Sequence, residues 1–451
     1  MNPYTEQIME EFEALSFEAS PEELRKSRQA FLSWKKVSVR ERSNYLRILS
    51  LRLREKQRIF AETITREMGK PIGQSQAEIE KCAWLCDYFA ENLEMFLREE
   101  VVQTEALRSY VTMEPLGIIM GIMPWNFPFW QVFRFAIPAL MAGNVCVLKH
   151  ASNVPMTALA IESLFRDSGL PDHVFKTLLV DAKTAMDLIE QELVDGVSLT
   201  GSVESGSEVA SLAGRHIKKF VLELGGSDPF IVLEDVDVSK VARMALQARM
   251  VNSGQSCIAA KRFIVIGSVA REFMEVLETE FRTLRIGDPM DSSTEIGPLA
   301  KPEIVETLSE QLADAQQKGA HVVYGPVPPT GEGFFFRPAI VYDVQQDMRI
   351  VAEEVFGPIL PVLVAETEEK IIEMANDSSY GLGATIWTKD LTKAERLAKE
   401  IGAGFVAIND IVRSDPRLPF GGIKKSGIGR ELSLHGLREF VNIKSVLIKE
   451  A

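Results

Sequence analysis

The strongest constraint on the fold is an alternation of short apolar runs with helical segments, which begins at Gly117 and continues almost to the C-terminus. Short apolar runs predict strands buried on both faces, and parallel strands need the crossover connections that helices supply. The alternation therefore predicts an α/β fold built on doubly wound, mostly parallel sheets. In such sheets a ligand binds at the carboxyl ends of the strands.

The alternation divides into two series, so two α/β domains are expected. In the first series strands are predicted at residues 117–123, 143–149, 174–180, 196–200 and 219–224, with helices near 129–142, 154–168, 183–193 and 203–214. In the second series strands are predicted at 228–233, 262–266, 321–324, 340–342, 383–387 and 404–408. The flanks differ: residues 20–98 have helical periodicity, 101–116 indicate a hairpin or extended arm, and 442–448 indicate one more strand.

Composition narrows the range of partners. The 451 residues carry a formal net charge of -14, which disfavours binding to nucleic acid or to anionic lipid over most of the surface. The N-terminus lacks a basic region followed by an apolar core, and the longest apolar stretch is interrupted by Arg134, Pro138, Gly143 and Asn144. We therefore expect a cytoplasmic protein that binds neither nucleic acid nor a membrane.

The cysteines and histidines do not form a recognisable metal or disulfide pattern. The four cysteines are widely separated except for Cys82 and Cys86, whose spacing suits small buried side chains on one helix. The five histidines are scattered, without the short spacings typical of zinc ligands. No metal site is expected.

Three polar positions indicate chemistry. Asn126 lies between two prolines at a strand end and is placed to donate a hydrogen bond to a developing oxyanion, although the segment also suits a rigid aromatic turn. Cys257 follows a small polar loop and is a candidate nucleophile, although a lone cysteine is commonly structural. Glu223 in an apolar strand is a candidate general base, with a salt-bridged structural acid as the alternative.

The segment 199–206 ends a strand in small residues and begins a helix. Backbone N–H groups there and the Ser202 hydroxyl form a candidate site for a pyrophosphate, although Thr and Ser also cap many helices. The common G-x-G-x-x-G dinucleotide fingerprint is missing. The motifs PWNFP at 124–128, KHASNVP at 149–155, TGS at 200–202, LELGG at 222–226, GQSC at 254–257, EEVFGP at 353–358 and PFGGIKKSG at 419–427 follow one another along the chain.

In this order, and over nearly the whole chain, these motifs resemble the NAD(P)-dependent aldehyde dehydrogenases. The resemblance implies that Cys257 attacks the aldehyde, that Asn126 and the Cys257 N–H hold the oxyanion, and that Glu223 activates the water that hydrolyses the thioester. It implies a Rossmann-like cofactor domain (1–98, 119–225 and 409–433), a thiol-bearing catalytic domain (226–408) and a small β bridging or oligomerisation element (99–118 and 434–451). A homodimer or homotetramer is expected. The cofactor contacts that it implies are Ile122, Pro124, Trp125, Lys149, Ser152, Gly201, Ser202, Glu354 and Phe356.

The choice of cofactor depends on Ser152, three positions after Lys149. In NAD-preferring relatives an acid often stands there and repels a 2′-phosphate. A neutral hydroxyl beside Lys149 accepts a phosphate, so the sequence favours NADP modestly over NAD. His150 leaves room for dual use, because its ring can add or withhold positive charge.

The substrate class depends mainly on Arg134, which stands among aromatic residues eight positions after Asn126. A buried guanidinium needs a partner, and a carboxylate on the substrate is one. Succinate-semialdehyde dehydrogenases similarly carry Arg at this position, and Ser414 is a weaker candidate for the far end of the substrate. The alternative is that Arg134 pairs with a protein acid across a subunit contact.

We therefore expect oxidation of an aldehyde, with succinate semialdehyde as the favoured substrate. The alternatives are a broad aliphatic aldehyde dehydrogenase in which Arg134 is structural, and a non-catalytic nucleotide-binding protein of the same fold. The joint presence of Cys257, Glu223 and Asn126 argues against the last, because a protein without chemistry needs none of them together. An acylating enzyme that passes the thioester to coenzyme A has less use for Glu223.

Overall fold

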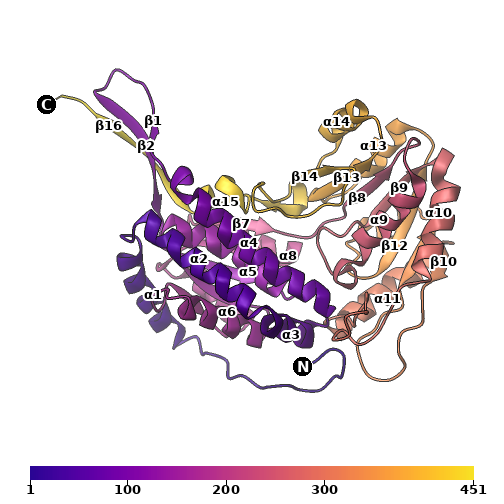
Figure 1. Cartoon of the computed structure of the whole chain (residues 1–451), viewed down its shortest axis with the longest axis horizontal. Coiled ribbons are helices and arrows are strands. Elements are labelled where there is room, and N and C mark those ends of the chain that lie inside the picture. Colours follow the sequence, from indigo (N-terminus) through magenta and orange to yellow (C-terminus); the bar gives the residue numbers. More distant parts are fainter. Residues whose placement is uncertain (451) are drawn as a thin grey trace.

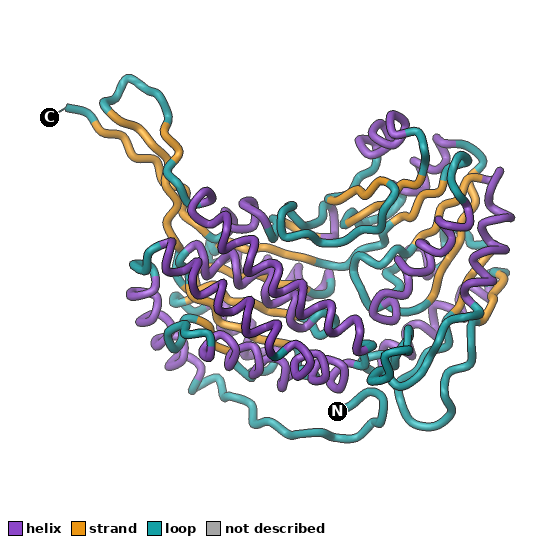
Figure 2. The backbone as a smooth tube through the Cα atoms, in the orientation of Figure 1, coloured by secondary structure: helices purple, strands orange, loops and turns teal. Residues whose placement is uncertain are grey.

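The computed structural model describes residues 1–450 and has two α/β bodies with a narrow arm projecting from one of them (Figures 1 and 2). Each body is built on its own sheet, and the arm is a third, small sheet. The predicted α/β fold with two mostly parallel sheets is confirmed. An extended N-terminal segment runs from the first body to the second, where Phe334 N–H donates to the carbonyl of Pro3 at 3.0 Å.

The first body contains a six-stranded sheet in the order β15-β7-β6-β3-β4-β5. All neighbouring strands are parallel except β15, which pairs antiparallel with β7. Its strands are β3 (Ile118–Met123), β4 (Val145–His150), β5 (Phe175–Thr177), β6 (Val194–Thr200), β7 (Lys219–Glu223) and β15 (Gly427–Ile428). The chain leaves β3 in one direction to β4 and β5, and returns on its other side as β6 and β7. Such a reversal of strand order opens a crevice at the carboxyl ends.

Helices cover the first sheet in layers. Helix α5 (Pro128–Ala142) packs against β3 and β4, α4 (Ile72–Phe96) packs on α5, and α2 (Val39–Glu55) packs on α4. The remaining helices of this body are α1 (Ser20–Trp34), α3 (Gln57–Met68), α6 (Pro155–Asp167), α7 (Ala182–Glu190), α8 (Val203–Arg215) and α15 (Ser433–Glu439). Within residues 1–450 no helix is long and apolar enough to cross a membrane.

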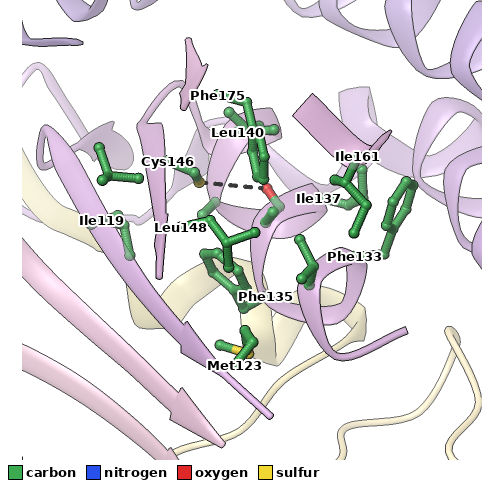
Figure 3. Close-up of a cluster of buried hydrophobic side chains, with 14 of the residues drawn as sticks. Ile119, Met123, Phe133, Phe135, Ile137, Leu140, Cys146, Leu148, Ile161 and Phe175 are labelled. Atoms are coloured by element: carbon green, nitrogen blue, oxygen red, sulfur yellow. Dashed lines mark hydrogen bonds between the residues drawn. The ribbon is translucent and has the colours of Figure 1, made fainter. Parts of the chain in front are cut away.

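Helix α5 is the centre of the first core. Every residue from Pro128 to Ala142 is buried, and Figure 3 shows Phe133, Phe135, Ile137 and Leu140 of this helix packed against strand and helix neighbours. The rings of Phe133 and Phe165 stack at 5.5 Å between centroids. A helix that is buried on all sides is closely packed, so α5 fixes the side chains that it carries, Arg134 among them, with little freedom.

The second body contains a seven-stranded sheet in the order β10-β11-β12-β9-β8-β13-β14, parallel except for β10. Its strands are β8 (Pro229–Val232), β9 (Arg262–Ile266), β10 (His321–Tyr324), β11 (Ala339–Tyr342), β12 (Ile359–Ala365), β13 (Gly383–Trp387) and β14 (Phe405–Ile408). Sequence reasoning missed β12. Its helices are α9 (Val238–Met250), α10 (Gly267–Phe281), α11 (Pro302–Gln317), α12 (Arg349–Ala352), α13 (Glu368–Asn376) and α14 (Leu391–Glu400), with 3-10 turns η1 (Val251–Gly254) and η2 (Lys424–Ser426).

The arm consists of β1 (Glu100–Val101), β2 (Arg108–Pro115) and β16 (Val441–Ile448), all antiparallel (Figure 1). Asn144, which is fully buried, ties the base of the arm to the first body. Its side-chain oxygen accepts from Leu116 N–H at 2.8 Å and Gly117 N–H at 3.0 Å, and its amide donates to the Phe440 carbonyl at 2.9 Å.

Replacement of Asn144 by Ala should destabilise the protein by about 3 kcal/mol, because three buried backbone groups lose their partners. The measurement is the thermal unfolding midpoint. Replacement of the exposed Asn44 by Ala is the matched control and should change the stability by less than about 0.5 kcal/mol. An Asn144→Ala midpoint equal to that of the wild type would contradict this role.

Candidate active site

Two amide hydrogen bonds bring the loop of Cys257 to the strand end that carries Asn126. Asn126 Nδ2 donates to the Gln255 carbonyl at 3.2 Å, and Asn252 Nδ2 donates to the Asn126 carbonyl at 2.8 Å. Asn126 follows β3 in the first body, whereas Asn252 and Gln255 precede β9 in the second. The seam therefore joins the two bodies at the place where the sequence predicted chemistry.

The loop that carries Cys257 has an unusual backbone. Asn252 and Ser253 lie in the left-handed region at φ 52° and 55°, and Gly254 follows at φ 78°. A Cβ at Gly254 would lie 2.3 Å from the Gly357 carbonyl oxygen, so only glycine fits. The GQSC and EEVFGP segments therefore pack directly against each other, with Gly254 in the first and Gly357 in the second.

Lys261 stabilises the same loop through hydrogen bonds to its backbone. Its fully buried Nζ donates to the carbonyls of Ser256 at 2.9 Å, Cys257 at 2.7 Å and Ala259 at 3.2 Å. It also lies 3.4 Å from the Glu354 carboxylate. The ammonium thus satisfies three carbonyls of the thiol loop, and it connects this loop to an acid in the EEVFGP motif.

The Cys257 side chain is partly exposed, whereas Cys82, Cys86 and Cys146 are fully buried and all four are free. Burial raises the pKa of the Cys257 thiol to about 12, although the charges of Arg134 and Lys261 oppose the shift. The thiol is therefore protonated at rest. A group that removes its proton or a cation that approaches it is needed to produce the reactive thiolate.

Glu223 ends β7 and is 2 % exposed. Neither carboxylate oxygen has a hydrogen-bond partner among the described residues. Burial raises its pKa well above the ordinary value, and the nearby Glu431 adds to the shift while Arg134 opposes it. A buried acid with a raised pKa and free oxygens is suited to accept a proton from water.

Arg134 of α5 is 2 % exposed and forms an ion pair through Nε with Glu431, while its Nη2 lies 4.0 Å from the Glu223 carboxylate. Its guanidinium also lies 4.6 Å from the centre of the Phe420 ring. The alternative to substrate binding was that Arg134 pairs with a protein acid across a subunit contact. The acid that the structure places there is in the same chain, and substrate binding by Arg134 stays a prediction.

Most of the residues expected to hold a nucleotide lie at or near the carboxyl ends of β3, β4 and β6, whereas Glu354 and Phe356 lie in the second body between α12 and β12. Ile122 is in β3 and is followed by Pro124 and Trp125, whose ring meets that of Phe356 edge-on at 5.8 Å. Gly201 and Ser202 directly precede α8, and Ser202 caps the helix: its Oγ accepts from the Ser205 N–H at 3.2 Å. Glu354 Oε1 accepts from the Gly226 N–H at 3.1 Å.

Lys149 is the penultimate residue of β4, and Ser152 follows the strand with an exposed side chain. Burial lowers the pKa of Lys149, and the charge of Lys301 lowers it further, so the two ammonium groups repel each other. Lys301 precedes α11 in the second body. A phosphate dianion between them would relieve the repulsion, so the residues present fit a phosphorylated nucleotide.

His150 does not modulate this charge as expected. Its Nε2 bonds the Pro128 carbonyl at 2.9 Å and its Nδ1 accepts from the Ala151 N–H at 2.9 Å. Burial lowers its pKa to about 4, so the ring is neutral near neutral pH. The prediction that His150 adds or withholds positive charge is therefore wrong, because the ring is locked into the core beneath the loop.

A cavity of about 680 Å³ opens beside the thiol. Cys257, Arg134 and Ser414 all line it, together with Trp130 and Phe127 of the segment after Asn126. The sequence-predicted thiol, guanidinium and serine therefore share one pocket. A volume of this size accommodates a small substrate with room for access from solvent.

Comparison with known proteins decides the family. The model of the aldehyde dehydrogenase family matches residues 1–446. The chain belongs to the aldehyde dehydrogenase family. It is 46% identical over 448 residues to a Synechocystis protein described as a probable succinate-semialdehyde dehydrogenase (NADP+), covering 99% of each chain.

Solved aldehyde dehydrogenase structures have the same fold. A succinic semialdehyde dehydrogenase from Streptococcus pyogenes, in complex with NADP+, superposes with a TM-score of 0.97 at 35% identity, covering 100% of this chain and 99% of that one. A betaine aldehyde dehydrogenase from Staphylococcus aureus, in complex with NAD+, superposes at 0.95 and 30% identity, covering 100% and 91%.

Sequence reasoning missed four charged residues of this aldehyde dehydrogenase site. They are Lys81, Lys261, Lys301 and Glu431, and all except Lys261 reach the site from a segment distant from the residue that they contact. Only Lys261, four residues after Cys257, carried a local signal: with Arg262 it follows a run of small and apolar residues.

In the folded protein without cofactor, iodoacetamide should label Cys257 alone. Because the pKa of this thiol is raised to about 12, the labelling rate should keep rising with pH beyond about 8.5, where an ordinary thiol begins to level off. The measurement is peptide mass spectrometry over a pH series, with Cys257→Ser as the unlabelled control. A rate that levels off near the ordinary thiol pKa would contradict the protonated resting state.

Proposed function

We propose that the protein oxidises succinate semialdehyde to succinate with NADP+. The observation that carries the proposal is that Asn126 is hydrogen-bonded to the loop of Cys257, while Glu223 lies 4.0 Å from Arg134, which lines one pocket together with Cys257. The names of the relatives given above support the substrate and the cofactor. A thiol nucleophile, a fixed amide donor and a buried base are the groups that aldehyde oxidation through a thioester requires.

The first half of the reaction uses Cys257 and Asn126. The Cys257 thiol gives its proton to solvent, and its sulfur bonds to the aldehyde carbon as the carbonyl oxygen takes up negative charge. Asn126 Nδ2 has two hydrogens, of which one is given to Gln255, so the other is available to the oxyanion together with the Cys257 N–H. When bound by the contacts proposed below, NADP+ would supply the acceptor for the hydride that leaves the same carbon, and a thioester on Cys257 would remain.

The second half uses Glu223. Its carboxylate takes a proton from water as the water oxygen attacks the thioester carbon, the carbon–sulfur bond breaks, and the Cys257 sulfur takes up the proton that Glu223 received. Arg134 and Glu431 border the carboxylate and balance the charge that it gains and loses. Because the pKa of Glu223 is raised by burial, the basic form grows as the pH rises, so hydrolysis of the thioester should accelerate with pH.

Glu223→Gln should preserve formation of the thioester but slow its hydrolysis by about 100-fold or more. The expected result is a burst of one NADPH per active site, followed by slow turnover with no pH dependence from this group. Stopped-flow absorbance of NADPH measures both phases. Cys257→Ser is the control and should give neither burst nor turnover while still binding NADP+. Unchanged steady-state turnover in Glu223→Gln would contradict the role of Glu223 as base.

The proposed preference for NADP+ is supported by Lys149, Lys301 and the neutral Ser152. Two lysines from different bodies that repel each other favour a ligand with a dianionic phosphate, and the position of Ser152 holds no acid to repel it. We propose that Lys149 contacts the adenosine ribose, that Ser202 and Gly201 contact the pyrophosphate, and that Glu354 and Phe356 contact the nicotinamide ribose. Ile122, Pro124 and Trp125 complete the proposed cofactor contacts at the end of β3.

Ser152→Glu should lower the ratio of kcat/KM for NADP+ over that for NAD+ by about tenfold or more, because a carboxylate then faces the phosphate. Lys301→Met should lower the same ratio by removing a cation. The measurement is initial rates with each cofactor at saturating aldehyde. Lys389→Met, an exposed lysine of the second body, is the control and should leave the ratio unchanged. If Lys301→Met affected both cofactors equally, Lys301 would not contact the 2′-phosphate.

One observation favours a second candidate function. Because Arg134 already has Glu431 as its partner, the residue can be structural, which is what a broad aliphatic aldehyde dehydrogenase would need. In that enzyme butanal and succinate semialdehyde would be oxidised with similar efficiency. A comparison of kcat/KM for these two aldehydes separates the candidates, since the proposed function requires a clear advantage for the carboxylated substrate. In the proposed function, Ser414 contacts the end of succinate semialdehyde that carries the carboxylate.

We also propose that the protein forms a homodimer or homotetramer through the arm. The arm projects from the first body, and Val101, Ile443 and Leu447 expose 66%, 56% and 58% of their surface there. Exposed apolar side chains on a narrow sheet favour contact with another copy of the chain. The free cysteines fit the proposed cytoplasmic location, where thiols stay reduced.

A further inference from the structure

Lys81 is a cation in the active-site pocket that the reaction described above does not use. It lies on α4, on the side of the helix that faces α5, and it lines the same pocket as Cys257, Arg134 and Ser414. Its ammonium lies 4.3 Å from the centre of the Trp130 ring. Lysine heads are usually solvated at the surface, so a lysine in this place needs an explanation.

Ser414 receives two hydrogen bonds at one oxygen. Lys81 Nζ donates to Ser414 Oγ at 2.8 Å, and Trp130 Nε1 donates to the same atom at 3.0 Å. Both lone pairs of the hydroxyl are therefore used, and its own hydrogen remains free to donate. The ammonium has two further hydrogens. Lys81 and Ser414 thus present donors and no acceptor, which is the arrangement that binds an anion.

The charge of Lys81 is not compensated by a neighbouring acid. Among the described residues Lys81 forms no ion pair, whereas Arg134 is paired with Glu431. Glu78, one turn earlier on α4, is occupied by the buried Lys70 and by the N–H groups of Phe129 and Trp130. A carboxylate entering the pocket therefore finds its uncompensated positive charge at Lys81.

Burial supports this assignment. It lowers the pKa of Lys81 to about 8, with Arg134 contributing to the shift and Cys82, Glu78 and Asp415 opposing it. Asp415 is itself paired with Arg417 at 2.7 Å. An ammonium destabilised by burial gains more from an entering anion than a solvated one would, because the anion replaces the lost hydration.

The register of α5 places this pair at a suitable distance from the reacting end. Trp130 and Arg134 are four residues apart, so they lie on one face of the helix separated by one turn, about 6 Å. Arg134 opposes the rise in the pKa of Cys257 and lies beside Glu223, so the turn of α5 that carries Arg134 lies next to the reacting groups. One turn away from it lies the group formed by Trp130, Lys81 and Ser414, within reach of the far end of a short aliphatic substrate.

We propose that Lys81, together with the hydroxyl of Ser414, binds the distal carboxylate of the substrate and sets the preference for aldehydes that end in a carboxylate. The inference rests on the proposed function, because it assigns a residue to the recognition of that substrate. Trp130 fixes both groups, through its indole N–H and through its ring face. Arg134 keeps its place between Glu431 and Glu223.

The test compares succinate semialdehyde with butanal, which has a methyl group in place of the carboxylate. Lys81→Met should lower kcat/KM for succinate semialdehyde by about 10- to 100-fold, mainly through KM, and should change kcat/KM for butanal little. Lys81→Arg keeps the charge and should retain most of the preference. Lys36→Met, an exposed lysine, is the matched control. Binding of NADP+ by each variant verifies that the fold is intact.

The pH dependence provides a second readout. In the wild type, the ratio of kcat/KM for the two aldehydes should fall as the pH rises through about 8, because kcat/KM reports the free enzyme and Lys81 then loses its proton. In Lys81→Arg the ratio should stay constant over this range. The butanal rate corrects for titration of Cys257 and Glu223, which affects both substrates.

The outcomes are distinct. A wild-type preference that survives in Lys81→Met would overturn the inference and leave the proposed function standing. An equal loss on both aldehydes would also overturn it, since it would show a structural role for Lys81. A wild type that oxidises both aldehydes equally well would overturn the proposed function, and this inference with it.

Discussion

The amide hydrogen bonds among Asn126, Asn252 and Gln255 are the constraint on which the site depends. The thiol and its oxyanion donor are carried by different sheets, and small shifts between the sheets would separate them. The seam is buried, so each broken hydrogen bond would leave an unsatisfied polar group and cost about 1–3 kcal/mol. Packing in both bodies keeps this seam in place. Helix α5 is buried along its whole length behind Asn126, and the close contact between Gly254 and Gly357 fixes the thiol loop.

Three cations lie in or beside the active site, and each has different partners. Lys261 is satisfied by three backbone carbonyls and fixes the thiol loop, whereas Arg134 is satisfied by Glu431 and borders the base. Lys81 has a serine and an aromatic ring but no acid. Because a buried ion is costly unless it is paired, an anionic ligand gains most at Lys81, which alone among these three cations has no acid as its partner. This difference, more than the overall net charge of -14, determines which small anions the pocket accepts.

The sequence was sufficient for the parts of the structure that depend on local pattern. Period and length of the apolar runs placed β9, β10 and β13 at their observed bounds, and the chemistry of Asn126, Glu223 and Cys257 could be proposed because each stands at a conspicuous break in its own segment. Strand β12 was missed because its apolar run follows the EEVFGP turn directly. Lys81 was missed for a different reason. It meets Ser414 across 333 positions of sequence, and on its own helix it looks like any solvated lysine. His150 was misread because the loop that buries its ring cannot be seen locally.

The central claim is that turnover passes through a thioester on Cys257 that Glu223 hydrolyses. The most direct measurement is mass spectrometry of the protein quenched in acid during turnover of succinate semialdehyde with NADP+. The account predicts the mass of one succinyl group on the peptide that contains Cys257, accumulating in Glu223→Gln and absent when NADP+ is omitted. A modified residue other than Cys257, or full turnover with no acyl group on any peptide of the slowed variant, would contradict it.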